Sequence, residues 1–164
     1  MKDTVRYTLV LFIISFLAAI LLSTTYAVTQ PRIEKARQEQ EDEAVKEVLP
    51  QAKQTKEAEK NGINYYEALD EGGTLIGYIF ICEAKGYSSV IRAVVSAKPD
   101  GTLLTIKILE QNETPGIGSK ITEGVFLDGF KGKNKNDTID TITGATISSS
   151  ALVSSVKATM EKIF

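Results

Sequence analysis

Apolar residues form one uninterrupted run near the start of the chain and alternate with polar residues in its middle. No charged residue lies between Tyr7 and Pro31, and residues 8–28 are long enough to cross a bilayer as a helix. A secretory signal peptide is the alternative, but its apolar core usually has only about 7–15 residues. The pattern therefore favours an uncleaved transmembrane anchor over residues 1–30.

Charges of both signs follow the apolar run and mix with a few apolar positions. Residues 32–49 are typical of a helix that ends before Pro50. We interpret residues 31–60 as a juxtamembrane charged helix or spacer, either solvated or in contact with a partner. Basic residues flank the apolar run on both sides, so charge alone does not fix the orientation of the anchor. The remaining residues, 61–164, suit one domain with a single core.

Alternating and β-branched positions in the middle of the chain predict four strands. They are residues 63–69, 74–83, 90–97 and 102–109. The turn at 70–73 makes the first two a hairpin, and Pro99 and Gly101 supply the backbone geometry of a second turn. We therefore expect an antiparallel meander.

Helical spacing returns toward the C-terminus. We expect a short helix within residues 119–130, with Val125, Phe126 and Phe130 on its apolar side, and a short strand at 138–142. A closing helix from about Ser148 to Ile163 has apolar residues every three or four positions, which should face the sheet. The predicted fold class is α+β: a transmembrane helix, then one domain with a mainly antiparallel sheet packed against helices.

Composition removes several classes of function. The net charge is −2, which gives no electrostatic footprint for nucleic acid. The chain has no histidine and one cysteine, Cys82, which excludes Ser-His-Asp catalysis and cysteine-based zinc or iron–sulfur sites within it. We expect no catalytic residue and no metal site. Redox chemistry, if any, would need an organic cofactor.

Hydroxyl side chains gather where the last predicted helix begins. Residues 142–155 contain seven of them around the pair Gly144 and Ala145. A helix N-terminus offers unpaired N–H groups and a partial positive charge, which suit a phosphate. Gly144 allows a tight turn, Ala145 leaves space, and the serines of 148–150 can cap the helix or donate to phosphate. A plain capped turn remains the alternative.

Two further loops have unusual composition. In 113-ETPGIG-118, an acid precedes a Pro-Gly turn of type II character and two glycines leave backbone N–H groups accessible. Its spacing fits neither a phosphate-binding P-loop nor a dinucleotide fingerprint. In 84-AKGYSS-89, Tyr87 could lie against a flat ligand, although an exposed turn explains the loop equally simply.

The order of these features along the chain resembles one family. The anchor, the charged helix, 85-KGY-87, 113-ETPGIG-118 and 140-DTITGATISS-149 look like the G subunit of the Rnf complex, the ion-translocating ferredoxin:NAD oxidoreductase. The same FMN-binding domain occurs in the C subunit of the sodium-translocating NADH:quinone reductase. The Asp-x-x-Thr-Gly-Ala-Thr-x-Ser pattern, which begins at Asp140, is the most specific part of the resemblance.

The resemblance implies a covalent flavin and a set of residues around it. FMN would be linked through its phosphate to Thr146 as a phosphoester, installed by a flavin transferase that uses FAD and for which Asp140 serves recognition. The phosphate would lie among the hydroxyls of 148–150. The residues implied to bind the cofactor are Thr146, Thr143, Gly144, Ala145, Ser148, Ser149, Glu113, Thr114, Gly116, Gly118, Gly86 and Tyr87.

The resemblance also implies a role and a place in the cell. The chain would be a single-pass protein of the cytoplasmic membrane with its domain on the extracytoplasmic side. It would pass electrons within the Rnf complex, with other membrane and peripheral subunits and the lipid bilayer as partners, and without substrate turnover of its own. Two alternatives stay open: a stand-alone extracytoplasmic FMN-binding electron-transfer protein, and an anchored binding module without redox chemistry.

Overall fold

The N-terminal part of the chain is a single long helix. The computed structural model describes residues 2–164, in which α1 (Lys2–Val48) contains Pro31 in its interior. By length and composition α1 is apolar enough to cross a membrane. The chain divides into two compact units, the first ending at Gln40 and the second running over Glu41–Phe164. Residues 41–60, which we interpreted as part of a spacer, thus belong to the second unit.

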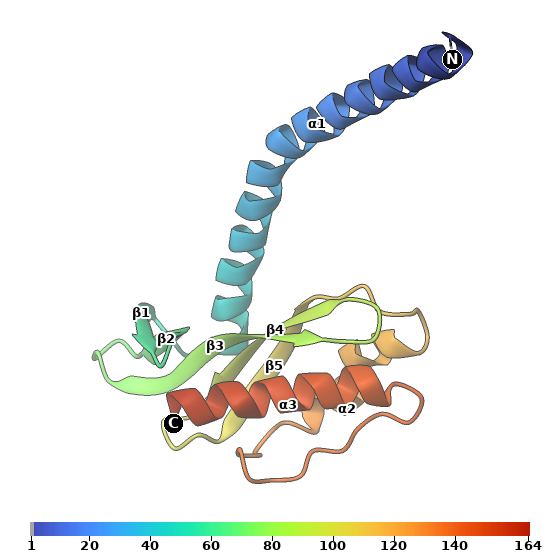
Figure 1. Cartoon of the computed structure of the whole chain (residues 1–164). Coiled ribbons are helices and arrows are strands. Elements are labelled where there is room, and N and C mark those ends of the chain that lie inside the picture. The colour runs from blue at the N-terminus through green and yellow to red at the C-terminus, as the bar shows by residue number, and fades with distance from the viewer. Residues whose placement is uncertain (1) are drawn as a thin grey trace. The chain divides into compact units, whose positions relative to one another are not determined.

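The second unit is built on one antiparallel sheet whose strands follow their order in the chain (Figure 1). The strands are β1 (Gln54–Lys60), β2 (Ile63–Leu69), β3 (Leu75–Lys85), β4 (Val90–Ala97) and β5 (Leu103–Glu110). The four predicted strands correspond to β2–β5, so the predicted meander is confirmed. The turn at 98–101 closes with a hydrogen bond from Gly101 N to Lys98 O, and Gly101 has a φ of +84°.

Strand β1 is the element that our sequence interpretation missed. It is polar and mostly exposed, as an edge strand can be, and it pairs only with β2. The connection is Asn61-Gly62, in which both residues have positive φ, 52° and 73°. An Asn-Gly pair is the strongest short-range signal of a two-residue hairpin, so the sequence did contain the information.

Helix α3 (Thr146–Ile163) covers one face of the sheet and packs mainly on β3 (Figure 1). Its buried positions recur at helical spacing, as predicted: Leu152, Val156, Met160 and Ile163. They join side chains of one alternate set in the strands, such as Phe80 and Val95, in the larger core cluster.

The last turns of α1 within the second unit cover the opposite face of the sheet. Val45, Val48 and Leu49 are buried with Ile79 and Val94, which belong to the other alternate set of strand positions. The hydroxyl of Ser96 also donates to the carbonyl of Val48, at 2.9 Å. The second unit therefore has three layers, with the sheet in the middle.

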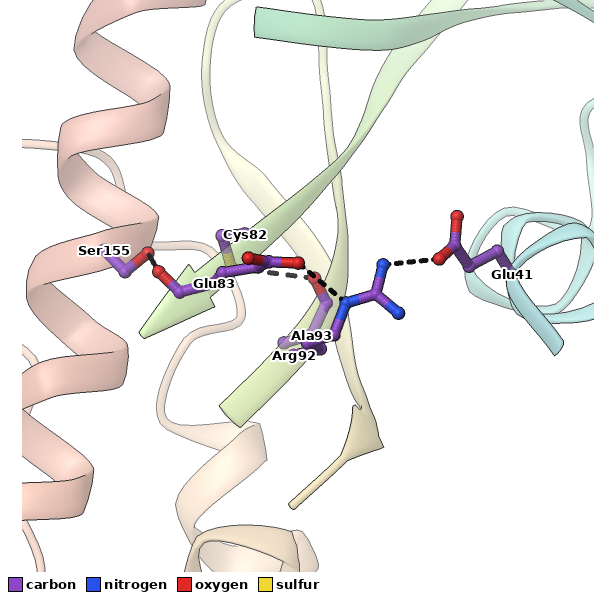
Figure 2. A network of polar contacts seen from close by, with 6 residues as sticks. All are labelled: Glu41, Cys82, Glu83, Arg92, Ala93 and Ser155. Carbon is purple, nitrogen blue, oxygen red and sulfur yellow. Dashed lines mark hydrogen bonds and ion pairs between the residues drawn. The ribbon is translucent and has the colours of Figure 1, made fainter. Parts of the chain in front are cut away.

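A polar network connects these layers (Figure 2). Arg92 on β4 donates through Nε to Glu83 at 2.9 Å and forms an ion pair with Glu41 of α1. From α3, the hydroxyl of Ser155 donates to the backbone carbonyl of Glu83 at 2.7 Å. The Arg92 side chain is only 16% exposed, so both carboxylates compensate its partial loss of water.

The segment between β5 and α3 differs from the prediction in three respects. The expected helix at 119–130 is split into a 3₁₀ turn, η1 (Gly118–Thr122), and one helical turn, α2 (Gly124–Asp128). Within it Phe126 and Phe130 are buried as expected, but Val125 is 88% exposed. The expected strand at 138–142 does not form. The apolar side chains of residues 138–142 contribute to the core cluster, but the backbone of this segment does not pair with a strand.

Candidate functional site

The loops at residues 84–89 and 113–118 and the start of α3 enclose a pocket of about 450 Å³. It is lined by Tyr87, Glu113, Thr114, Ile117, Gly118, Gly144, Ala145, Thr146, Ile147 and Ser148. The lining is largely apolar at the rim, where Tyr87, Ile117 and Ile147 are more than half exposed. Its size lies within the range of small-molecule sites, about 300–1,000 Å³.

The floor of the pocket contains a buried carboxylate. Glu113 is 5% exposed and accepts hydrogen bonds from the backbone of residues 87–89 and from the hydroxyl of Ser148, at 2.7 Å. Burial alone would raise the pKa of Glu113, but the hydrogen bonds from Ser148 and from residues 88–89 outweigh it and lower the pKa below the ordinary glutamate value. The side chain is therefore an anion at neutral pH.

The loop 113–118 has the predicted turn. Gly116 has a φ of +72°, and Ile117 N donates to Thr114 O at 3.2 Å, as a type II turn with Pro115 and Gly116 at its centre requires. Gly116 N donates to the hydroxyl of Ser119, so this amide is already occupied. Gly118 is buried against Glu113, where a side chain has no room.

The Thr-Gly-Ala-Thr segment makes a tight turn into α3. Gly144 has a φ of +86°, which favours glycine, and Ala145 N donates to Ile142 O at 2.9 Å. The residue before the helix is Ala145, and no side chain caps the helix N-terminus. The N–H groups in the first turn of this 18-residue helix therefore have no side-chain acceptor.

The serines of this turn do not cap the helix, so the alternative of a plain turn with serine capping is wrong. Helix α3 begins at Thr146, which places Ser148, Ser149 and Ser150 inside its first turns. Ser148 donates to Glu113. The hydroxyl of Ser149 is fully buried, accepts from Ile142 N at 3.0 Å and donates to Ala145 O at 2.9 Å. Ser150 bonds to the carbonyl of Ile147.

Comparison with known proteins shows relatives along nearly the whole chain. The G subunit of an ion-translocating oxidoreductase complex from Methanosarcina acetivorans is 30% identical, over 99% of this chain and 95% of its own. The G subunit of a Na⁺-translocating ferredoxin:NAD⁺ oxidoreductase complex from Acetobacterium woodii is 32% identical, over 98% and 91%. This chain belongs to the G-subunit family of ion-translocating oxidoreductase complexes. The resemblance predicted from the sequence is confirmed.

Family profiles match two parts of this G-subunit chain. The RnfG N-terminal region matches residues 1–48 and the FMN-binding domain matches residues 86–161. The crystal structure of NqrC from Shewanella oneidensis has the same fold, with a TM-score of 0.54 and 22% identity over 67% of this chain and 66% of that one. The predicted α+β domain with an antiparallel sheet is therefore confirmed.

The structure brings most of the predicted site residues of this G-subunit chain together, but not all. Eight line the pocket: Tyr87, Glu113, Thr114, Gly118, Gly144, Ala145, Thr146 and Ser148. Five do not: Gly86, Gly116, Thr143, Ser149 and Asp140. Asp140 lines a separate hollow of about 410 Å³ with Lys133 and Phe126.

Two lining residues, Ile117 and Ile147, were absent from our prediction. Each is an exposed apolar residue beside a predicted motif residue. Isoleucine has no reactive or hydrogen-bonding group in its side chain, so a motif of binding residues does not include it. The signal that could have found them is their position, since each isoleucine lies between two small or hydroxyl residues of a predicted motif.

Proposed function

We propose that this chain is a membrane-anchored flavoprotein subunit of an ion-translocating ferredoxin:NAD⁺ oxidoreductase complex, in which it relays electrons through an FMN attached to Thr146. Its membership of the G-subunit family and the match of its domain to the FMN-binding domain support this. FMN, when bound, supplies the electron-transfer chemistry that no side chain of this protein provides. The protein binds, positions and tunes that group.

The pocket has the features that FMN requires. Tyr87, Ile117 and Ile147 offer apolar surface for a flat ring system. The N–H groups at the start of α3, which no side chain caps, suit a phosphate. The proposal rests above all on this uncapped helix start with an exposed threonine as its first residue.

Thr146 suits attachment better than Thr143. The side chain of Thr146 lines the pocket, and its hydroxyl makes only a long contact of 3.4 Å with Ile142 O. Thr143 is exposed but does not line the pocket. Attachment joins the Thr146 oxygen to the FMN phosphorus of FAD. The hydroxyl proton is lost and AMP leaves.

Intact mass of the protein from its native host tests the attachment. We expect the mass of the chain plus FMN less one water, and loss of that increment in Thr146→Ala. Thr143→Ala, a matched change in the same turn, should keep the increment. An unmodified wild-type protein in a host with an active flavin transferase would contradict the proposal and favour a binding module without redox chemistry.

Co-purification tests membership of the complex. Mild detergent extraction should release this chain with the other subunits of a ferredoxin:NAD⁺ oxidoreductase. A flavinylated chain that migrates alone would favour the stand-alone electron-transfer protein instead.

We also propose that α1 is a single membrane span and that the domain lies on its extracytoplasmic side. The single cysteine, Cys82, is buried, and burial raises its pKa to about 12. A cysteine placed at exposed Lys56 on β1 is then the only reactive thiol. Labelling of Lys56→Cys by a membrane-impermeant maleimide in intact cells is expected, and labelling only after lysis would contradict this sidedness.

A further inference from the structure

Glu113 collects an unusual number of hydrogen bonds for a single buried carboxylate. It accepts from the backbone N–H groups of Tyr87 at 3.2 Å, Ser88 at 3.1 Å and Ser89 at 2.9 Å. Two hydroxyls add to these, Ser89 at 3.1 Å and Ser148 at 2.7 Å. All of these donors lie 24 to 35 residues away from Glu113 in the chain.

These bonds join the three segments that form the pocket. Glu113 comes from the loop after β5, residues 87–89 from the loop after β3, and Ser148 from the first turn of α3. None of the ion pairs found within residues 2–164 includes Glu113. Its charge is stabilised by neutral donors alone, so it is not cancelled by a cation at the site.

The surrounding glycines leave room for this carboxylate. A Cβ on Gly86 would lie 2.4 Å from Glu113 Oε1, and a Cβ on Gly118 would lie 2.8 Å from Glu113 Cβ. Neither position tolerates a side chain without displacing Glu113. Gly86 and Gly118 thus leave space for the carboxylate, and Gly118 also lines the pocket.

We propose that Glu113 is a positioning residue with an electrostatic effect on the cofactor: its carboxylate holds the loops at 87–89 and 113–118 against the start of α3, and its uncancelled negative charge at the pocket floor lowers the reduction potential of the bound flavin. Reduction adds electrons to the flavin, and a nearby buried anion opposes added negative charge. This inference rests on the proposed function, because it needs FMN in this pocket.

The test compares Glu113→Gln with the full-length wild type in detergent. Glutamine has the same shape but carries no charge. Its NH2 group is a donor, so it cannot accept the hydrogen bonds that a carboxylate oxygen accepts at the same position. Glu123→Gln is the matched control, since Glu123 is exposed and its side chain has no hydrogen bond or ion pair in the described part of the chain. Two quantities are measured: amide hydrogen exchange at residues 87–89 in protein without flavin, and the midpoint potential of the flavin in the modified protein.

We expect exchange at residues 87–89 to become about tenfold faster or more in Glu113→Gln, because bonds to a charged acceptor are lost. The midpoint potential should become more positive. Glu123→Gln should change neither. Glu113→Asp keeps the charge on a shorter side chain, so it should accelerate exchange while its potential stays nearer the wild-type value, and it carries the test if the glutamine variant does not fold.

Wild-type exchange rates and an unchanged potential in Glu113→Gln would overturn the inference. So would a potential that shifts equally in Glu113→Asp and Glu113→Gln, since charge would then not be the cause. A wild-type protein without flavin would contradict the proposed function instead, and exchange at residues 87–89 would still decide whether Glu113 holds the loops.

Discussion

Replacement of Gly118 by alanine tests how tightly Glu113 is enclosed. The new Cβ would lie 2.8 Å from Glu113 Cβ and 2.9 Å from Oε2. Carbon atoms pack at about 3.5–4.0 Å, so the overlap is about 0.7 Å or more. Gly118 has no left-handed φ, so the cost comes from contact. Overpacking of this kind costs about 1–3 kcal/mol, and we expect that loss in the free energy of unfolding.

Gly86 lies against the same carboxylate as Gly118. A Cβ at Gly86 would lie 2.4 Å from the other carboxylate oxygen of Glu113 and 2.8 Å from buried Ile91. Gly86→Ala should therefore also cost about 1–3 kcal/mol. Once one alanine has displaced the carboxylate, the other meets less resistance, so the double variant should be less destabilised than the sum by about 0.5 kcal/mol or more.

Urea unfolding of the full chain in detergent, followed by tyrosine fluorescence, measures these changes. The chain has six tyrosines and no tryptophan, and four of the tyrosines lie in the second unit. Gly124→Ala is the control, because a Cβ there meets nothing within 4 Å, and it should stay within about 0.5 kcal/mol of wild type. A neutral Gly118→Ala, or strict additivity in the double variant, would refute the argument that both glycines enclose one carboxylate.

Three other predictions concern stability. Ser149→Ala should cost about 1–3 kcal/mol by urea unfolding, because it leaves Ile142 N without its acceptor; a neutral result would mean that water replaces the hydroxyl. Arg92→Met should cost about 1–2 kcal/mol, and Lys53→Met, which breaks an exposed ion pair, less than about 0.5 kcal/mol; equal costs would contradict the role given to the network in Figure 2. The pKa of Glu113 is lowered in the folded protein, so its carboxylate stabilises the fold at any pH above the ordinary glutamate pKa. This stabilisation is lost as the pH falls from the ordinary glutamate pKa through the lowered pKa of the folded state. Acid should therefore reduce the stability of the wild type more steeply than that of Glu113→Gln, and parallel pH profiles would contradict this.

Local sequence rules predicted the sheet well because its strands are connected by short turns. Alternation identified β2–β5, and the turn residues fixed their antiparallel order. Strand β1 escaped because a polar edge strand has no apolar face, and only Asn61-Gly62 marked it. The expected strand at 138–142 failed for the opposite reason. Buried Ile139 contributed to an apolar pattern there, but a side chain can join the core without any strand pairing of its backbone.

The site was predictable as a motif but not as a network. The sequence brought Glu113 and Thr146 into one hypothesis through resemblance, and the structure places both in one pocket. The function of the serines was not accessible in this way. Whether Ser148 caps a helix or donates to a carboxylate 35 residues away depends on tertiary contacts, and hydroxyl groups satisfy either geometry.

The contacts that hold α3 bear on the proposed attachment of a cofactor to its first residue. Side chains such as Leu152 and Met160 fix the helix in the core. At its C-terminal end, Lys60 and Asn61 donate to the last carbonyls of α3, at 2.5 and 2.7 Å. At the other end the hydroxyl of Ser148 donates to Glu113 and that of Ser149 bonds to the backbone of the turn before the helix, while the first N–H groups have no side-chain cap. Thr146, the proposed attachment point, is therefore held by contacts that leave the first N–H groups of α3 without a side-chain acceptor. In the proposed function, the reach of the flavin is then set by the flavin's own chain and not by movement of the helix.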